Sequence, residues 1–171
     1  EFVLVAEETG LIDEIGRWVI KEACRQLSDW RERLKSTFFA SIKLSGRQLR
    51  DPRLVTSIND ILAATQLPGD ALELQVREAS LIDAPKEVRD RLTALRSVGV
   101  RIAIDDFGTG YSSLGLIRRM PFDCMKLDRS LIADLYSDLG ATGVTAAVVA
   151  MARALRICSV ASSISSLGAS I

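Results

Sequence analysis

The stretch RIAIDDFGTGYSSL, from Arg101 to Leu114, joins an apolar run to two adjacent aspartates and a glycine-rich turn. The run predicts a buried strand that ends at Asp105. Because successive strand residues face opposite sides of a sheet, Asp105 and Asp106 can share one site only where the strand ends and the backbone turns. The glycines that follow permit such a turn, so this stretch predicts a polar site at the end of a buried strand.

Strands and helices alternate on either side of this stretch. Asp51 and Pro52 are expected to open a helix as its N-cap and first residue, and Gly99 is expected to end another. The alternation favours parallel βαβ units, arranged either as an open doubly wound sheet or as part of a (β/α) barrel. Apolar periodicity predicts helices at 11–30, 52–65, 85–98 and 143–155, and strands at 36–45, 71–78, 100–105, 122–127 and 157–161.

Polar residues at the ends of the predicted strands form the candidate site. In both architectures, function gathers at the carboxyl ends of parallel strands. Neighbouring carboxylates at such an edge repel unless a proton or a cation lies between them, and a divalent metal is the usual solution at neutral pH. The residues expected near this edge are Ser45, Glu78, Asp105, Asp106, Lys126, Asp128 and Ser162.

The absence of histidine narrows the chemistry of this edge. It removes the commonest general base and transition-metal ligand, and it leaves carboxylate, lysine and hard-cation chemistry. Two-metal hydrolysis of a phosphodiester would suit Asp105 and Asp106 as metal ligands with Lys126 as a cation. The simpler alternative is a helix-capping aspartate with an ion-paired neighbour, and the aspartate pair alone favours that alternative.

The composition limits the class of protein. With 171 residues, 48% hydrophobic and 26% charged, the chain is expected to form one domain over 1–171, with an atypical serine- and alanine-rich end at 159–171. Basic and acidic residues both total 22, so neither DNA nor an anionic membrane surface is an expected partner. No apolar run reaches the roughly 20 residues of a membrane helix. Three scattered cysteines favour reduced thiols and a cytoplasmic location.

The longer motif IDDFGTGYSSL, followed by PFDCMKLDRSLI, resembles the DDFGTG and KxD segments of the EAL domain family, bacterial hydrolases of cyclic di-GMP. Other segments resemble the family in the same order, among them SIKLSGRQLRDPRLV and LELQVREASLI. The resemblance implies an α/β fold, a partial (β/α) barrel of the modified TIM-barrel type. The matching segments lack the family's first strand and its closing C-terminal strands, so the domain is expected to be incomplete.

The resemblance also implies roles for individual residues. Asp105 would bridge two divalent metals, magnesium or manganese in the family, and Asp106 would ligate one of them. Lys126, in KLD, would be the catalytic residue that contacts the attacking water or the scissile phosphate. Glu78, in VRE, matches the glutamate that steadies the loop beside the metals.

Several positions depart from the family pattern. Lys43, in KLS, replaces an asparagine ligand, and Gln75, in LELQVRE, replaces a metal-binding glutamate. Ser162 and Ser165, in ASSIS, replace two further carboxylates. Each lost carboxylate–cation contact forgoes on the order of 4 kcal/mol at roughly 4 Å and an effective dielectric near ~20. Tight binding of two metals is therefore not expected.

The charges of this site can be balanced in two ways. Lys43 and Lys126 could neutralise Asp105 and Asp106 directly and leave a metal-free, ion-paired site. Alternatively, the long Lys43 stem could carry its charge away into solvent.

The favoured function is a degenerate, catalytically inactive EAL domain that binds cyclic di-GMP or a protein partner. The alternatives are a fragment of an active metal-dependent cyclic di-GMP phosphodiesterase and a decaying gene product, which would aggregate or fail to fold. The segment 143–155 is rich in small apolar residues, so it is either a homodimer face or an ordinary buried barrel helix.

Overall fold

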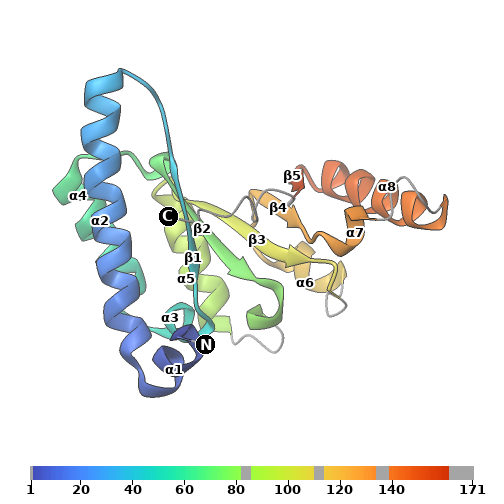
Figure 1. Cartoon of the computed structure of the whole chain (residues 1–171), viewed down its shortest axis with the longest axis horizontal. Coiled ribbons are helices and arrows are strands. Elements are labelled where there is room, and N and C mark those ends of the chain that lie inside the picture. The colour runs from blue at the N-terminus through green and yellow to red at the C-terminus, as the bar shows by residue number, and fades with distance from the viewer. Residues whose placement is uncertain (1, 82–85, 110–113, 134–138, 162–171) are drawn as a thin grey trace.

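The computed structural model describes residues 2–81, 86–109, 114–133 and 139–161, and its centre is one parallel sheet (Figure 1). Five strands lie side by side in chain order, and all neighbours are parallel. They are β1 (Ala40–Leu44), β2 (Leu72–Arg77), β3 (Arg101–Phe107), β4 (Cys124–Leu127) and β5 (Cys158–Ala161).

Helices connect these strands. In Figure 1, α2 runs along the β1 end of the sheet, and α8 extends away beyond β5. The α-helices are α1 (Phe2–Thr9), α2 (Leu11–Leu34), α3 (Gly46–Arg50), α4 (Leu54–Thr65), α5 (Lys86–Ser97), α6 (Leu114–Arg119), α7 (Ser130–Ala133) and α8 (Leu139–Ala154), and two 3-10 turns are η1 (Gly69–Ala71) and η2 (Glu78–Leu81).

The strand order distinguishes between the two predicted architectures. In a doubly wound sheet the order reverses at a switch point, whereas in a barrel it advances in one direction. Here the order runs from β1 to β5 without reversal, and among the described strands β1 and β5 do not pair with each other. The predicted partial barrel is confirmed, with β1 and β5 as the open edges over the described residues.

One face of the sheet carries the hydrophobic core. Every second residue of these strands points to this face. Leu74, Ile102 and Met125 are fully buried there, together with helix residues such as Ile58 and Leu92. Their even spacing explains why the apolar half of each strand was predictable from sequence. The opposite face is polar, as the alternation in 71–78 predicts. In β2, however, that polar face is buried as well, with Glu73 and Gln75 both below 10% exposed.

The elements after β1 differ from the sequence prediction. Asp51 and Pro52 do not begin α4, which starts at Leu54 with Arg53 as its N-cap. Asp51 instead ends α3, and its carboxylate accepts hydrogen bonds from the Arg53 backbone at 2.9 Å and from the Arg53 side chain. These bonds hold the pKa of Asp51 below its usual value. The turn from Asp51 to Arg53, held by these hydrogen bonds, stands where the sequence predicted the start of the helix.

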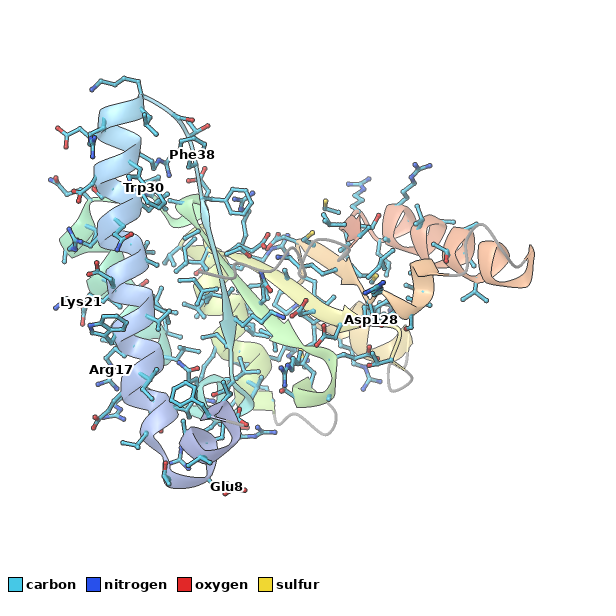
Figure 2. The ribbon with its side chains drawn as sticks, viewed as in Figure 1. Glu8, Arg17, Lys21, Trp30, Phe38 and Asp128 are labelled. Atoms are coloured by element: carbon cyan, nitrogen blue, oxygen red, sulfur yellow. The ribbon has the colours of Figure 1, made fainter. Side chains whose placement is uncertain are left out.

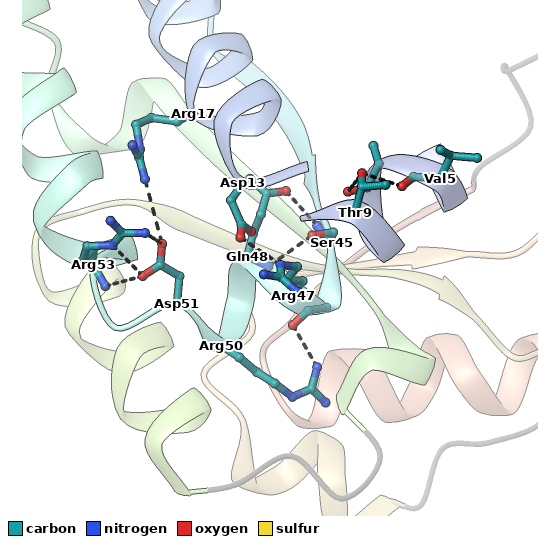
Figure 3. A network of polar contacts seen from close by, with 12 residues as sticks. Val5, Thr9, Asp13, Arg17, Ser45, Arg47, Gln48, Arg50, Asp51 and Arg53 are labelled. Carbon is teal, nitrogen blue, oxygen red and sulfur yellow. Dashed lines mark hydrogen bonds and ion pairs between the residues drawn. The ribbon is translucent and has the colours of Figure 1, made fainter. Parts of the chain in front are cut away.

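The short helix α3 was not predicted, although its capping signal is present in the sequence. Ser45 accepts from the Gln48 backbone at 3.1 Å, and the Gln48 side chain accepts from the Ser45 backbone at 3.1 Å. This reciprocal pair is a capping box. Figure 3 shows it beside the Asp13–Arg47 ion pair, which ties α3 to α2 at 2.9 Å.

The far end of the sheet is thinly covered. Val160 of β5 is 45% exposed, and Val144 of α8 is 55% exposed. The prediction for residues 143–155 is confirmed as helix, but α8 packs only in part, through Ala152 and its neighbours. Ser162, Ser165 and the rest of the serine-rich end lie outside the described residues. Among the helices of the described chain, none is both long and apolar enough to cross a membrane.

Candidate active site

The polar face of the sheet brings four strand residues into one hydrogen-bonded cluster. Glu73 accepts from Ser41 at 2.5 Å and pairs with Lys126 at 3.0 Å. The Ser41 hydroxyl also accepts from Lys126 at 3.1 Å and from Gln75. The neighbouring strands hold these side chains in register, since Ser41 lies opposite Glu73. Lys126 is therefore already neutralised by a carboxylate that is 5% exposed.

Lys43 and Asp105 form the second charged pair of the site. The Lys43 ammonium lies 2.8 Å from Asp105 Oδ2, and the aspartate side chain is only 2% exposed. Within the described chain, that oxygen accepts no well-aligned hydrogen bond, so the lysine charge is its main compensation. The predicted pairing of Lys43 with Asp105 is present. The alternative, in which the lysine points away into solvent, is wrong for this structure.

Asp106 leaves the strand geometry. Its φ is 55°, and the register between β3 and β4 shifts between Ile104 and Phe107. Such an irregularity re-aims a side chain next to a site. Despite this irregularity, β3 continues to Phe107 and does not end at Asp105 as predicted. The Asp106 carboxylate lies 3.7 Å from the Arg77 guanidinium, and Lys126 pairs with Glu73. The alternative in which Lys43 and Lys126 neutralise both aspartates therefore holds for Lys43 and is wrong for Lys126.

Glu78 holds the loop that follows β3. Its Oε2 accepts from the Gly108 backbone at 3.0 Å, and the side chain is 1% exposed. Gly108 has a φ of 104°, which favours glycine, and a Cβ there would collide with Leu131 of α7. Glu78 thus contacts the loop as the resemblance implied.

The donor set does not suit two dications. Asp105 is committed to Lys43, and Asp106 lies beside Arg77. Gln75, at the position of an expected ligand, donates to Ser41 and carries no charge. Over the described ranges, no group of three or more histidine, cysteine, aspartate or glutamate side chains is placed to hold a metal. The residues present therefore do not fit the magnesium or manganese pair that the sequence motif implies.

Sequence reasoning missed three members of the site. Ser41, Glu73 and Arg77 face the same side as the predicted residues, and a period of two from Lys43 and Gln75 would have found them.

Two other candidates serve local structure. Ser45 caps α3, and Asp128 accepts from the Ser130 backbone at 2.8 Å at the start of α7. The Ser130 side chain and then its backbone N–H hold the pKa of Asp128 below its usual value. Ser162 lies beyond the described part of the chain.

Comparison with known families agrees with this arrangement. The family model of the EAL domain matches residues 1–167. The chain belongs to the EAL domain family. The resemblance predicted from the sequence is therefore confirmed.

Characterised proteins are similar over most of the chain. The bifunctional diguanylate cyclase/cyclic di-GMP phosphodiesterase MucR of Pseudomonas aeruginosa is 38% identical over 160 residues, which cover 92% of this chain and 23% of MucR. The chain spans between 18% and 24% of the length of the curated relatives that it matches. Two of these relatives, MucR and PdeR of Escherichia coli, are named as cyclic di-GMP phosphodiesterases.

Solved structures share the fold. The PaMucR phosphodiesterase in its c-di-GMP complex has a TM-score of 0.88 at 36% identity, covering 97% of this chain and 67% of that chain. The FimX EAL domain of Xanthomonas citri in complex with c-diGMP has a TM-score of 0.87 at 26% identity, covering 96% of this chain and 65% of that chain. This EAL domain therefore has the fold of domains that have been solved with the nucleotide bound.

Proposed function

We propose that this EAL domain binds cyclic di-GMP without metal and does not hydrolyse it. The observation that carries the proposal is the 2.8 Å ion pair between Lys43 and the buried Asp105. A lysine cation in this position competes with a dication for the same carboxylate. The site would thus be neutralised by the protein's own side chains.

Charge balance supports the loss of hydrolysis. Two-metal hydrolysis needs bridging carboxylates, an activated water and cations on the phosphoryl oxygens. Here Asp105 and Asp106 each face a basic side chain, and Gln75 supplies an amide in place of a carboxylate. Each lost carboxylate contact removes on the order of 4 kcal/mol of attraction for a unit charge at roughly 4 Å and an effective dielectric near ~20.

The same charges favour an anionic ligand. Lys43 and Arg77 are more than 60% exposed, and they lie at the carboxyl ends of adjacent strands. A cyclic dinucleotide carries two phosphodiester charges, and exposed cations at the rim of a barrel can contact them. MucR and FimX, which share this fold, have been solved with cyclic di-GMP. Binding without chemistry is the function that these features favour.

Calorimetric titration with cyclic di-GMP tests this function. The folded chain is titrated in EDTA and then in excess magnesium or manganese, and the linear dinucleotide product is monitored by chromatography. We expect the same affinity in both conditions and no product. Lys43→Ala should weaken binding, whereas Lys21→Ala, on the outer side of α2 (Figure 2), should not.

Two other outcomes would contradict the proposal. Metal-dependent binding with turnover would favour the alternative, a fragment of an active phosphodiesterase in which Asp105, Asp106 and Lys126 keep the roles implied by the motif. An absence of binding in both conditions, with the fold intact by circular dichroism, would leave the domain as a protein-contact module.

A further inference from the structure

Two of the three cysteines face each other across the last two strands. Cys124 opens β4, Cys158 opens β5, and they are register partners in the parallel pair. Cys124 is 7% exposed, whereas Cys158 is exposed. The third cysteine, Cys24, is fully buried in α2. A single accessible thiol therefore lies beside a buried one.

We propose that Cys124 and Cys158 form a dithiol site that closes to a disulfide with a peroxide and that binds trivalent arsenicals in its reduced form. Nothing in the proposed nucleotide-binding function requires this pair. The pair lies on the polar face of the sheet, since Cys124 is two residues before Lys126 on the same strand.

The backbone geometry supports closure. Adjacent strands lie about 4.8 Å apart, and register partners point to the same face. A disulfide needs its two Cα atoms roughly 4.4–6.8 Å apart with the side chains on the same side. The two side chains also interact. Burial raises the pKa of Cys124, and the neighbouring Cys158 thiol raises it further, to about 12. The bond would join β5 to β4, next to an open edge of the sheet.

The exposed thiol is the one that a peroxide reaches first. The Cys158 thiolate attacks one peroxide oxygen, the O–O bond breaks, and a sulfenic acid and water form. The Cys124 sulfur then attacks the Cys158 sulfur and loses its proton, the S–O bond breaks, and a second water leaves. The two thiols lose two electrons and two protons in total, and the peroxide is reduced to two waters.

Mass spectrometry of the whole chain tests the pair. The chain is treated with hydrogen peroxide, denatured and alkylated with N-ethylmaleimide. We expect three alkyl groups before oxidation and one afterwards, with the loss of two hydrogens from the monomer. Phenylarsine oxide should bind the reduced chain at one equivalent.

Single-cysteine variants provide the controls. Cys24→Ser should keep both the disulfide and the arsenical binding, whereas Cys158→Ser should lose both. Because Cys158 is exposed, this variant is expected to fold even if Cys124→Ser does not. The proposal is overturned if peroxide adds only oxygen atoms to the monomer, or if Cys158→Ser still binds one equivalent of phenylarsine oxide.

Discussion

Lys43 supplies the positive charge that neutralises the buried Asp105 carboxylate. It is exposed over 61% of its side chain, yet its ammonium neutralises an aspartate that is 2% exposed. Removal of one partner from such a pair leaves a buried acceptor without compensation, which costs about 1–3 kcal/mol and more for a charged group. The long Lys43 side chain on β1 can reach this aspartate on β3, across β2, because its stem is flexible.

Replacement of this lysine by the ligand type of the family should therefore create a metal response. We expect Lys43→Asn to lower the free energy of unfolding by about 1–3 kcal/mol in EDTA, because Asp105 loses its counter-charge. Excess manganese should recover part of that loss, since Asp105, Asp106 and the new amide all offer oxygen ligands. Urea denaturation in EDTA and in manganese measures both effects.

A surface pair provides the matched control for this variant. Lys86 pairs with Asp90 at 2.7 Å, but both side chains are at least half exposed. Exposed pairs of this kind contribute about 0.2–1 kcal/mol. Lys86→Asn should thus change the stability little and show no manganese response. An equal manganese response in the two variants would mean that the Lys43 position has no link to metal binding.

At the scale of elements, the sequence predicted the type of most strands and helices but not their ends. The apolar half of β3 was visible as VRIAI, whereas the last two residues of the strand depend on a register shift against β4. Likewise, the start of α4 at Leu54 depends on the hydrogen bonds that Asp51 makes with Arg53. Local propensity contains neither kind of contact, and so the boundaries were wrong by two residues.

The partners in the site were predictable to a similar extent. The motif located Asp105, Asp106, Glu78 and Lys126 on one edge, because strand ends converge there in any parallel sheet. It did not specify that Lys126 would pair with Glu73, since Lys126 lies on β4 and Glu73 on β2, so that the contact crosses β3. A side-chain contact between strands that are not adjacent in the sheet leaves no recognisable pattern in a single sequence.

The turn after β3 is held by contacts with η2 and α7. These contacts determine the expected effect of a methyl group on Gly108. In Gly108→Ala, the φ of 104° becomes strained and the new Cβ collides with Leu131 of α7. We expect a loss of about 2 kcal/mol or more. The Glu78 hydrogen bond to this backbone should also loosen. Urea denaturation measures the loss.

A second glycine tests whether the loss is local to that turn. Gly143 lies in α8, and no atom of the described residues lies within 4 Å of the place that a Cβ would take there. Because alanine has the higher helix propensity, Gly143→Ala should be neutral or stabilising by up to about 1 kcal/mol. A similar destabilisation by both substitutions would show that the collision with Leu131 does not determine the effect.

At the scale of the whole molecule, the open sheet has a centre and two edges with very different burial. β2 and β3 pair on both sides, and Leu74, Ile102 and Ile104 are fully buried. β5 pairs with β4 alone among the described strands, and three of its four residues are exposed, Val160 at 45%. The free energy of opening should therefore fall from the centre towards β5.

Amide hydrogen exchange of the whole chain should resolve this gradient. Local opening free energies range from near zero at poorly packed segments to the global value in core strands. We expect the slowest exchange in β2 and β3, and exchange faster by orders of magnitude in β5 and α8. Low urea should accelerate β5 and α8 together if they open as one unit, because exposed surface gives opening a denaturant dependence. If β5 exchanged as slowly as β3, this end of the sheet would be covered in solution, and self-association through the β5 edge would have to be measured by sedimentation.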